Sequence, residues 1–104
     1  MDSGLSITAE KLVEVTARYA SKINVKDEEI EKLVGLSSKV IAKKVSQKVA
    51  FWLVDQKETL LYCKLCGKGP FTKKGLYLHL TRLHKGEIKG MLTEELKNEI
   101  RTLI

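Results

Sequence analysis

The sequence predicts a mostly α-helical protein that contains one small ββα unit. We divide the chain into a helical module over residues 1–59, the ββα unit over residues 60–86, and a C-terminal helix over residues 87–104. Two observations support this fold class. Apolar residues recur at helical spacing in the first and last parts. Both cysteines and both histidines lie in the middle part, within short segments that suit a hairpin and a helix.

Two predicted helices open the first part. The longer one starts at Thr8, which can act as its N-cap, and runs to about Ile23. Its apolar side consists of Leu12, Val15, Tyr19 and Ile23. The shorter one starts at Asp27, which can cap it, has further carboxylates near its positive end, and stops at Gly35. Its buried side consists of Ile30, Leu33 and Val34.

A third predicted helix starts at Ser37 or Ser38 and runs to about Gln56. At 100° per residue, one arc of this helix is apolar and consists of Ile41, Val45, Val49, Trp52 and Leu53. The opposite arc carries lysines with no acid among them, namely Lys39, Lys43, Lys44 and Lys48. The sequence leaves open whether residues 50–62 continue this helix or form a hairpin.

The remaining elements follow from turn and cap residues. Residues 60–71 suit a short hairpin around the cysteines, and residues 72–84 suit a helix. Gly86 and Gly90 indicate a connector. Thr93 then starts the last helix, with two glutamates in its first turn. The apolar side of this helix consists of Leu92, Leu96, Ile100 and Leu103.

The cysteines and histidines have the spacing of a tetrahedral zinc site. Two residues separate Cys63 from Cys66, and four separate His79 from His84. Cysteines at this spacing can turn both sulfurs to one point, and Gly67 suits the positive φ of such a turn. The helix must loosen before His84, because five positions on an ideal helix differ by about 140°. Four protein ligands close the coordination sphere, so we predict one structural Zn²⁺ ion.

Two other interpretations of these four residues are weaker. Unrelated thiols and imidazoles would not bring every cysteine and histidine of the chain into one metal-binding pattern. A redox Cys-x-x-Cys motif needs no histidines and usually opens a helix in a βαβ unit, a setting that the sequence does not indicate. We therefore retain the metal site.

Residues 62–84 resemble a Cys₂His₂ zinc finger. Leu76, three residues before His79, occupies the family's leucine position, whereas the aromatic residue Phe71 is displaced by one position. The resemblance implies a ββα fold whose small core depends on the metal for most of its folding free energy. That core would consist of Leu61 or Tyr62, Phe71, Leu76 and Leu80.

The resemblance also implies which residues would face DNA bases, namely Thr72, Lys74, Gly75 and Leu78. Only Lys74 is a good base reader among them, so we expect contacts mainly with phosphates. The predicted nucleic-acid contacts combine the finger with the lysine arc of the third helix. They are Lys73, Lys74, Arg82, Lys85, Lys39, Lys43, Lys44 and Lys48.

Residues 28–45 resemble a helix-turn-helix with Gly35 in the turn. The third helix would then present its lysines to the major groove or to phosphates. Glu31 and Lys44 depart from the pattern, because these positions are usually small and apolar respectively. The other interpretation is a helical bundle whose apolar sides pack on one another or on a second copy of the chain. The sequence leaves a homodimer open.

Positive charge is concentrated around the predicted zinc site. The chain carries a net charge of +6, and the basic residues of segment 63–90 face a single acid there, Glu87. Such a local field favours a polyanionic partner. We expect nucleic acid, DNA rather than RNA, and the role of a transcription regulator or accessory factor. The alternative is a protein–protein interaction module that docks on a larger assembly through an acidic partner.

Several other functional classes are disfavoured. The sequence indicates no nucleophile with a positioned base, no phosphate-binding glycine loop and no second metal cluster, so we expect neither an enzyme nor a small-molecule substrate. The longest apolar run, residues 49–54, is too short to cross a membrane. The N-terminus lacks the pattern of a secretory signal, and two cysteines are few for a disulfide-stabilised secreted domain. We therefore expect an intracellular protein.

Overall fold

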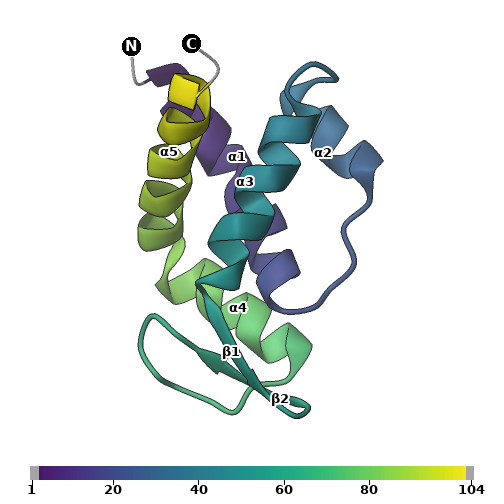
Figure 1. Cartoon of the computed structure of the whole chain (residues 1–104). Coiled ribbons are helices and arrows are strands. Elements are labelled where there is room, and N and C mark those ends of the chain that lie inside the picture. The colour runs from purple at the N-terminus through teal and green to yellow at the C-terminus, as the bar shows by residue number, and fades with distance from the viewer. Residues whose placement is uncertain (1–2, 103–104) are drawn as a thin grey trace.

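The fold is mostly helical with one two-stranded antiparallel sheet, in agreement with the predicted class (Figure 1). The computed structural model describes residues 3–102. Over these residues, every helix is too short or too polar to traverse a lipid bilayer. In chain order the elements are α1 (Ser3–Ala20), α2 (Asp27–Val34), α3 (Lys39–Phe51), β1 (Val54–Lys57), β2 (Leu60–Cys63), α4 (Lys73–Leu83) and α5 (Lys85–Thr102).

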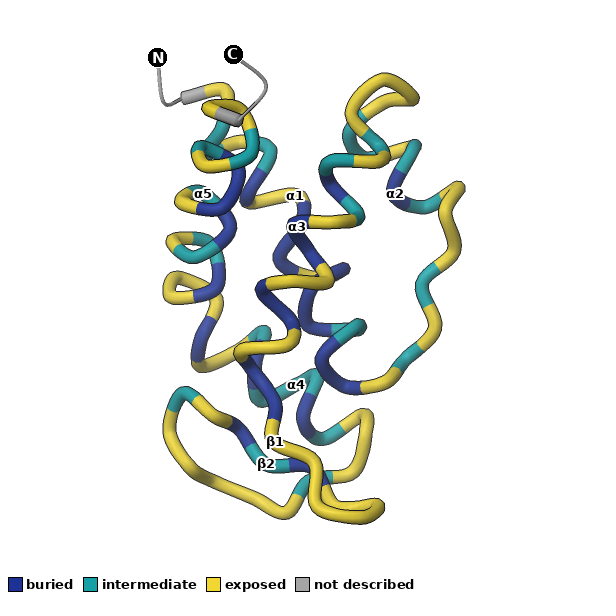
Figure 2. Tube along the Cα trace, viewed as in Figure 1, coloured by how far each residue is buried: buried dark blue, intermediate teal, exposed yellow. Residues whose placement is uncertain are grey.

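α1 is the centre of the fold. It contacts the other four helices, and α3 and α5 also pack against each other. Because neighbours surround it, α1 buries a wide arc that includes Leu12, Val13 and Thr16. Figure 2 shows this core as dark blue segments along α1, α3 and α5. We refer to α1, α2, α3 and α5 together as the helical bundle.

The start of α1 differs from the prediction. Thr8 does not cap the helix, because its hydroxyl donates to the carbonyl of Gly4 at 3.0 Å, inside the first turns. The earlier start lets Leu5 and Ala9 pack against the core. Burial of these side chains outweighs the local preference of threonine for a cap position, since tertiary packing supplies most of the stability of a helix.

The end of α1 comes three residues earlier than predicted, at Ala20. Lys22 adopts a left-handed conformation with φ 62°. The backbone N–H of Ile23 then returns to the carbonyl of Arg18 at 2.9 Å, which closes the helix in a Schellman-type turn. Glycine is the usual signal for such an ending, and a lysine in its place gives none.

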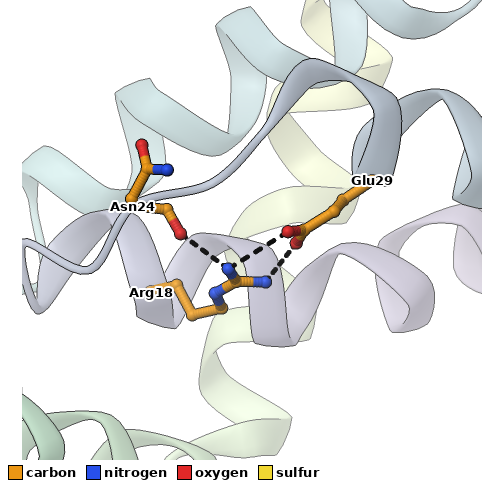
Figure 3. Close-up of polar contacts among 3 residues, drawn as sticks. All are labelled: Arg18, Asn24 and Glu29. Atoms are coloured by element: carbon orange, nitrogen blue, oxygen red, sulfur yellow. Dashed lines mark hydrogen bonds and ion pairs between the residues drawn. The ribbon is translucent and has the colours of Figure 1, made fainter.

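Arg18 holds the loop between α1 and α2 (Figure 3). Its guanidinium donates to the carbonyl of Asn24 at 2.6 Å and forms an ion pair with both carboxylate oxygens of Glu29. The hydrogen bond from Arg18 lowers the pKa of Glu29 below its ordinary value of 4.5. One side chain of α1 therefore fixes both the loop and the start of α2.

α2 and α3 confirm the predicted helices but correct their ends. α2 stops at Gly35, which has φ 89°. Asp27 is its first residue rather than its cap, because Lys26 occupies the N-cap position. α3 follows Ser38, whose side chain makes no capping hydrogen bond. The α3 helix ends at Phe51, so the predicted end at about Gln56 was wrong.

A hairpin, and not a longer helix, follows α3. β1 and β2 pair antiparallel with Val54 opposite Cys63. The last turn of α3 tightens as the N–H groups of Trp52 and Leu53 return to carbonyls three residues back. Leu53 and Val54 are both buried, so the chain enters the sheet through the core. The open alternative for residues 50–62 is thereby decided in favour of a hairpin. The hairpin predicted over residues 60–71 lies instead over residues 54–63, with only an isolated bridge between Leu61 and Phe71 beyond it.

α5 corrects the predicted connector. Gly86 and Gly90 both lie inside this helix, and the Thr93 hydroxyl donates to the carbonyl of Lys89 at 2.8 Å instead of capping a new helix. A glycine costs a helix about 1 kcal/mol relative to alanine. Burial of Ile88, Leu92 and Leu96 in the bundle core offsets this cost. Leu103, the last residue of the predicted apolar side, lies outside the described residues.

Candidate metal centre

The structure brings the four predicted ligands to one point. Cys63 ends β2, Cys66 lies in the following turn, His79 is in α4, and His84 follows the last residue of that helix. Their ligand atoms all lie within 4.8 Å of one another. We refer to residues 54–84, which contain β1, β2, α4 and this cluster, as the metal-held region.

The turn after β2 aims both sulfurs at the cluster. The N–H of Gly67 donates to the carbonyl of Cys63 at 2.7 Å, and the N–H of Cys63 donates to the carbonyl of Lys68 at 2.9 Å. Gly67 has φ 78°, which confirms the positive φ expected there. Cys63 is buried, whereas Cys66 is exposed. One sulfur thus faces the core and the other closes the site from the solvent side.

Gly69 has a structural role that the sequence analysis missed. Its φ is 150°, and a Cβ at this position would lie 2.6 Å from Cδ2 of Tyr62 and 3.0 Å from the carbonyl oxygen of Leu61. This close approach lets the N–H of Phe71 donate to the same Leu61 carbonyl at 2.7 Å. The only available signal was the glycine itself, beside the single proline of the chain.

α4 presents His79 to the cluster from its partly buried side. The Thr72 side chain caps the helix by accepting from the N–H of Gly75 at 3.0 Å. Leu76 and Leu80 are fully buried on the adjoining side. The ring centroid of Phe71 lies 4.7 Å from that of His79, so the displaced aromatic residue still supports the histidine. The predicted helix over residues 72–84 is confirmed as Lys73–Leu83.

His84 lies where α4 gives way to α5. Its φ of −122° and ψ of 17° break the helical geometry, as its spacing from His79 requires. The Nδ1 atom lies 2.6 Å from Oε1 of Glu87, a partner that the sequence analysis did not identify. The Nε2 atom is buried and has no hydrogen-bond partner in the protein. Metal ligation would satisfy Nε2, with Glu87 orienting the ring from behind.

The distances suit a tetrahedral metal ion. Two ligand atoms bonded to one metal at about 2.0–2.3 Å lie roughly 3.3–3.8 Å apart. Sγ of Cys66 is 3.3 Å from Nε2 of His79, within that range. Small side-chain movements would bring the remaining pairs, all within 4.8 Å, to the same separation. The four residues therefore fit one metal ion.

The four ligands have unequal proton affinities. Burial raises the pKa of Cys63, whereas the backbone N–H of Lys68 lowers the pKa of Cys66. Burial lowers the pKa of His79. Burial also acts to lower the pKa of His84, but the hydrogen bond between Nδ1 and Glu87, together with the nearby Cys66 sulfur, outweighs that effect and raises the pKa. A metal binds the deprotonated sulfurs and neutral imidazoles, so the affinity for the metal decreases as the pH is lowered.

The lysine arc of α3 is paired with acids from other helices. Lys39 and Lys43 lie 3.2 and 2.9 Å from Glu31 and Asp27 of α2. The other two lysines of the arc pair with α5: Lys44 with Glu99 at 3.1 Å and Lys48 with Glu95 at 3.0 Å. The α2–turn–α3 segment keeps the order of a helix-turn-helix, but its positive charge is locally compensated.

Basic residues of the metal-held region are in a different situation. Over residues 3–102, Lys73, Lys74 and Arg82 are exposed and form no ion pair. At 100° per residue, Lys74 and Arg82 lie on the side of α4 away from its buried leucines. Lys85, just beyond this region, pairs with Glu10 of α1 at 3.0 Å. The eight predicted contacts thus divide into three unpaired and five paired cations.

Fold and site define a class: a mostly helical protein with a Cys-Cys-His-His cluster between a two-stranded sheet and a helix. Comparison with known proteins does not narrow this class further. No family model matches the chain, and it has no significant match among curated proteins or solved structures.

Proposed function

We propose that the chain is a zinc-containing nucleic-acid-binding protein whose metal-held region is a single Cys₂His₂ finger. Two thiolates and two imidazoles are the donor set that zinc prefers in structural sites. β2 before the cysteine turn, the Leu61–Phe71 bridge after it, and α4 fit the ββα order of such a finger, with β1 as an additional strand. When bound, the ion supplies a cross-link that holds the sheet and α4 together; the chain's own residues supply the binding surface.

The distribution of unpaired cations carries this proposal. Lys73, Lys74 and Arg82 project from the metal-held region without acidic partners among residues 3–102, whereas the arc of α3 is neutralised by α2 and α5. Unpaired cations on a rigid helix are suited to phosphates, because binding then releases counterions without breaking an internal ion pair. The metal-held region is therefore the proposed contact surface.

Phosphate contacts fit this surface better than base reading does. Among the positions that would face bases, Gly75 has no side chain and Leu78 has only an apolar one. The Thr72 hydroxyl already accepts the N–H of Gly75 as a helix cap. Lys74 remains as the one side chain able to bind a guanine edge. We propose binding with little sequence preference; a role in transcription regulation stays a prediction.

Two charge-matched double variants test this proposal. Lys74→Gln with Arg82→Gln removes two unpaired cations, and Lys44→Gln with Lys48→Gln removes two paired ones. We expect the first to reduce the slope of log K against log salt for duplex DNA by about 1.8, at about 0.9 per phosphate contact. The control variant should change the slope little. Anisotropy titrations with duplex DNA, single-stranded DNA and RNA give these slopes.

Either of two results would overturn the proposal. The wild-type, zinc-loaded protein could show no salt-dependent affinity for any of the three nucleic acids. Alternatively, the two double variants could lose affinity equally, which would mean that net charge acts without a defined surface.

A protein-interaction module is the second candidate, and Gly75 and Leu78 favour it because they make a poor base-reading surface. The same cations would then bind an acidic partner. Binding to polyglutamate that is as tight as binding to DNA at equal salt, and equally weakened by Lys74→Gln with Arg82→Gln, would support this candidate over the first.

A further inference from the structure

A hollow lies where the helical bundle meets the metal-held region. It has a volume of about 550 Å³ and is bordered by the ends of α1 and α3, by β1, and by the turn after β2. This size is within the range of small-ligand sites, about 300–1,000 Å³. The lining side chains that matter here are Tyr19, Lys22, Gln47, Phe51, Asp55 and Lys64.

Phe51 is the most unusual residue of this hollow. It is the last residue of α3, and 72% of its surface is exposed, although a phenylalanine gains most from burial. Nζ of Lys64 lies over this ring, 5.4 Å from its centre. An exposed aromatic ring beside an ammonium group is the combination that stacks a base and holds the neighbouring phosphate in proteins that bind single strands.

Polar groups around the ring suit a nucleotide. Lys22 and Lys64 supply positive charge for a phosphate, while Gln47 and Asp55 supply hydrogen-bonding groups for a base edge. No hydrogen bond engages the Gln47 amide among the described residues, unlike Gln56 of β1, whose amide donates to the Glu58 carbonyl at 2.9 Å. The hollow therefore presents a stacking surface, a free amide and two cations together.

The loop that carries Lys22 is already fixed in place. Its left-handed backbone closes α1, and the Arg18 guanidinium holds the Asn24 carbonyl two residues further on (Figure 3). A ligand would thus meet Lys22 without having to order the loop, which reduces the entropic cost of binding.

We infer that this hollow binds an unpaired base of a single-stranded nucleic acid, stacked on Phe51 with its phosphate at Lys64. A duplex base is already stacked on both faces, so only a single strand can offer a free face to the ring. The inference rests on the proposed nucleic-acid binding and extends it, because the hollow lies outside the α4 cations that carry that proposal.

Three variants of the full, zinc-loaded chain test the stacking step. Phe51→Ala removes the ring, Phe51→Tyr keeps it, and Leu36→Ala removes another exposed apolar side chain, 69% exposed, from the turn between α2 and α3. The probes are oligothymidylate and oligouridylate of about ten nucleotides. Trp52, next to Phe51 and the only tryptophan of the chain, reports binding by its fluorescence.

We expect Phe51→Ala to weaken binding of both single strands by about tenfold or more. Phe51→Tyr and Leu36→Ala should bind like wild type, and duplex affinity should be unchanged in all three. The ratio of affinities for the two probes distinguishes DNA from RNA as the natural strand. Equal single-strand affinity of Phe51→Ala and wild type would overturn the inference.

Lys64→Gln tests the phosphate step, with Lys57→Gln as its control. Both lysines lie over an aromatic ring, but Lys57 is 5.5 Å from the Tyr62 ring, outside the hollow. Only Lys64→Gln should reduce the salt slope for oligothymidylate, by about 0.7. If the α4 double variant loses duplex binding while the Phe51 and Lys64 variants bind single strands normally, this inference fails and the proposed function stands. If wild type binds no nucleic acid, both fail.

Discussion

The helical bundle buries many aliphatic side chains between its helices, whereas the metal-held region has few of its own to bury. α1 alone contributes Ala9, Leu12, Val13, Val15 and Ala17 to the core. In the metal-held region the buried aliphatic residues are Val54, Leu61, Leu76 and Leu80, beside Cys63. Cross-linking by a metal compensates for such a small core. If the proposed zinc ion is bound, the two regions depend on different sources of stability.

The two regions also differ in how their charged side chains are paired. In the bundle, acids of one helix lie beside lysines of another, as in the pairs Lys43–Asp27 and Lys48–Glu95. In the metal-held region, the cations of α4 have no such partners among residues 3–102. Net charge is therefore a poor guide to a binding surface until the tertiary structure shows which charges are compensated.

Metal removal should change the stability of the protein most, and it should affect the two regions differently. Zinc contributes on the order of 10 kcal/mol to the folding of a finger. We expect a strong chelator, or Cys63→Ala, to unfold β1, β2 and α4 while α1 and α3 keep much of their helical signal. NMR signals of the hairpin amides report on the metal-held region, and circular dichroism reports on the remaining helical content.

Lys68→Ala, in the same turn as the cysteines but not a ligand, is the matched control and should leave the hairpin folded. Hairpin amide signals that persist after complete chelation would show that the metal-held region is stable by packing alone.

Removal of a core side chain from the bundle has the next largest expected effect. Leu12 is fully buried in α1, so Leu12→Ala should lower the free energy of unfolding by about 2–5 kcal/mol. Ile7 lies on the same helix but is 58% exposed, so Ile7→Ala should change it by less than about 0.5 kcal/mol. Urea unfolding of the zinc-loaded protein measures the free energy of unfolding of both variants. Equal losses in the two variants would contradict the central position of α1.

Loss of the ion pairs at α2 has the smallest expected effect on the stability of the protein. Hydrogen bonds from Lys43 and Arg18 lower the pKa values of Asp27 and Glu29 below their ordinary 3.8 and 4.5. Carboxylates with lowered pKa values stabilise the fold above their unfolded pKa, and this contribution is lost as the pH falls through the folded pKa. Asp27→Asn and Glu29→Gln should therefore destabilise the protein at pH 7 but not in strong acid.

Unfolding of these variants beside wild type, as a function of pH, checks that prediction. Because acid would also release a bound metal from every variant, the difference from wild type isolates the bundle pairs from the metal-held region. A difference that stays constant from neutral pH into strong acid would show that the two carboxylates do not act through their charge.

Local sequence signals predicted the metal cluster well, for a physical reason. Cys63 and Cys66 lie in one tight turn, and His79 and His84 at one helix end, so short-range geometry decides how each pair can approach a common point. Gly67 was predictable for the same reason, because positive φ is a property of single residues. Glu87 was not, since its contact with His84 depends on where α5 begins.

Helix ends were predicted less well where packing opposes local preference. Thr8 suits a cap and Gly90 suits a break, yet both lie inside helices whose neighbours bury Ala9 and Leu92. The free energy of burying an aliphatic side chain, about 1.5–3 kcal/mol, exceeds that of one cap or one glycine. Residues 50–62 stayed ambiguous for a similar reason, because an apolar run suits both a helix and a strand.

By itself, the sequence determined which cysteines and histidines form the cluster, the mostly helical class and the helix stop at Gly35, because each depends mainly on local sequence signals. Only the tertiary structure decided which cations remain uncompensated. Lys44 meets Glu99, and Lys85 meets Glu10, across helices that are distant in sequence. Ion pairing depends on distance in space, and folding alone sets that distance.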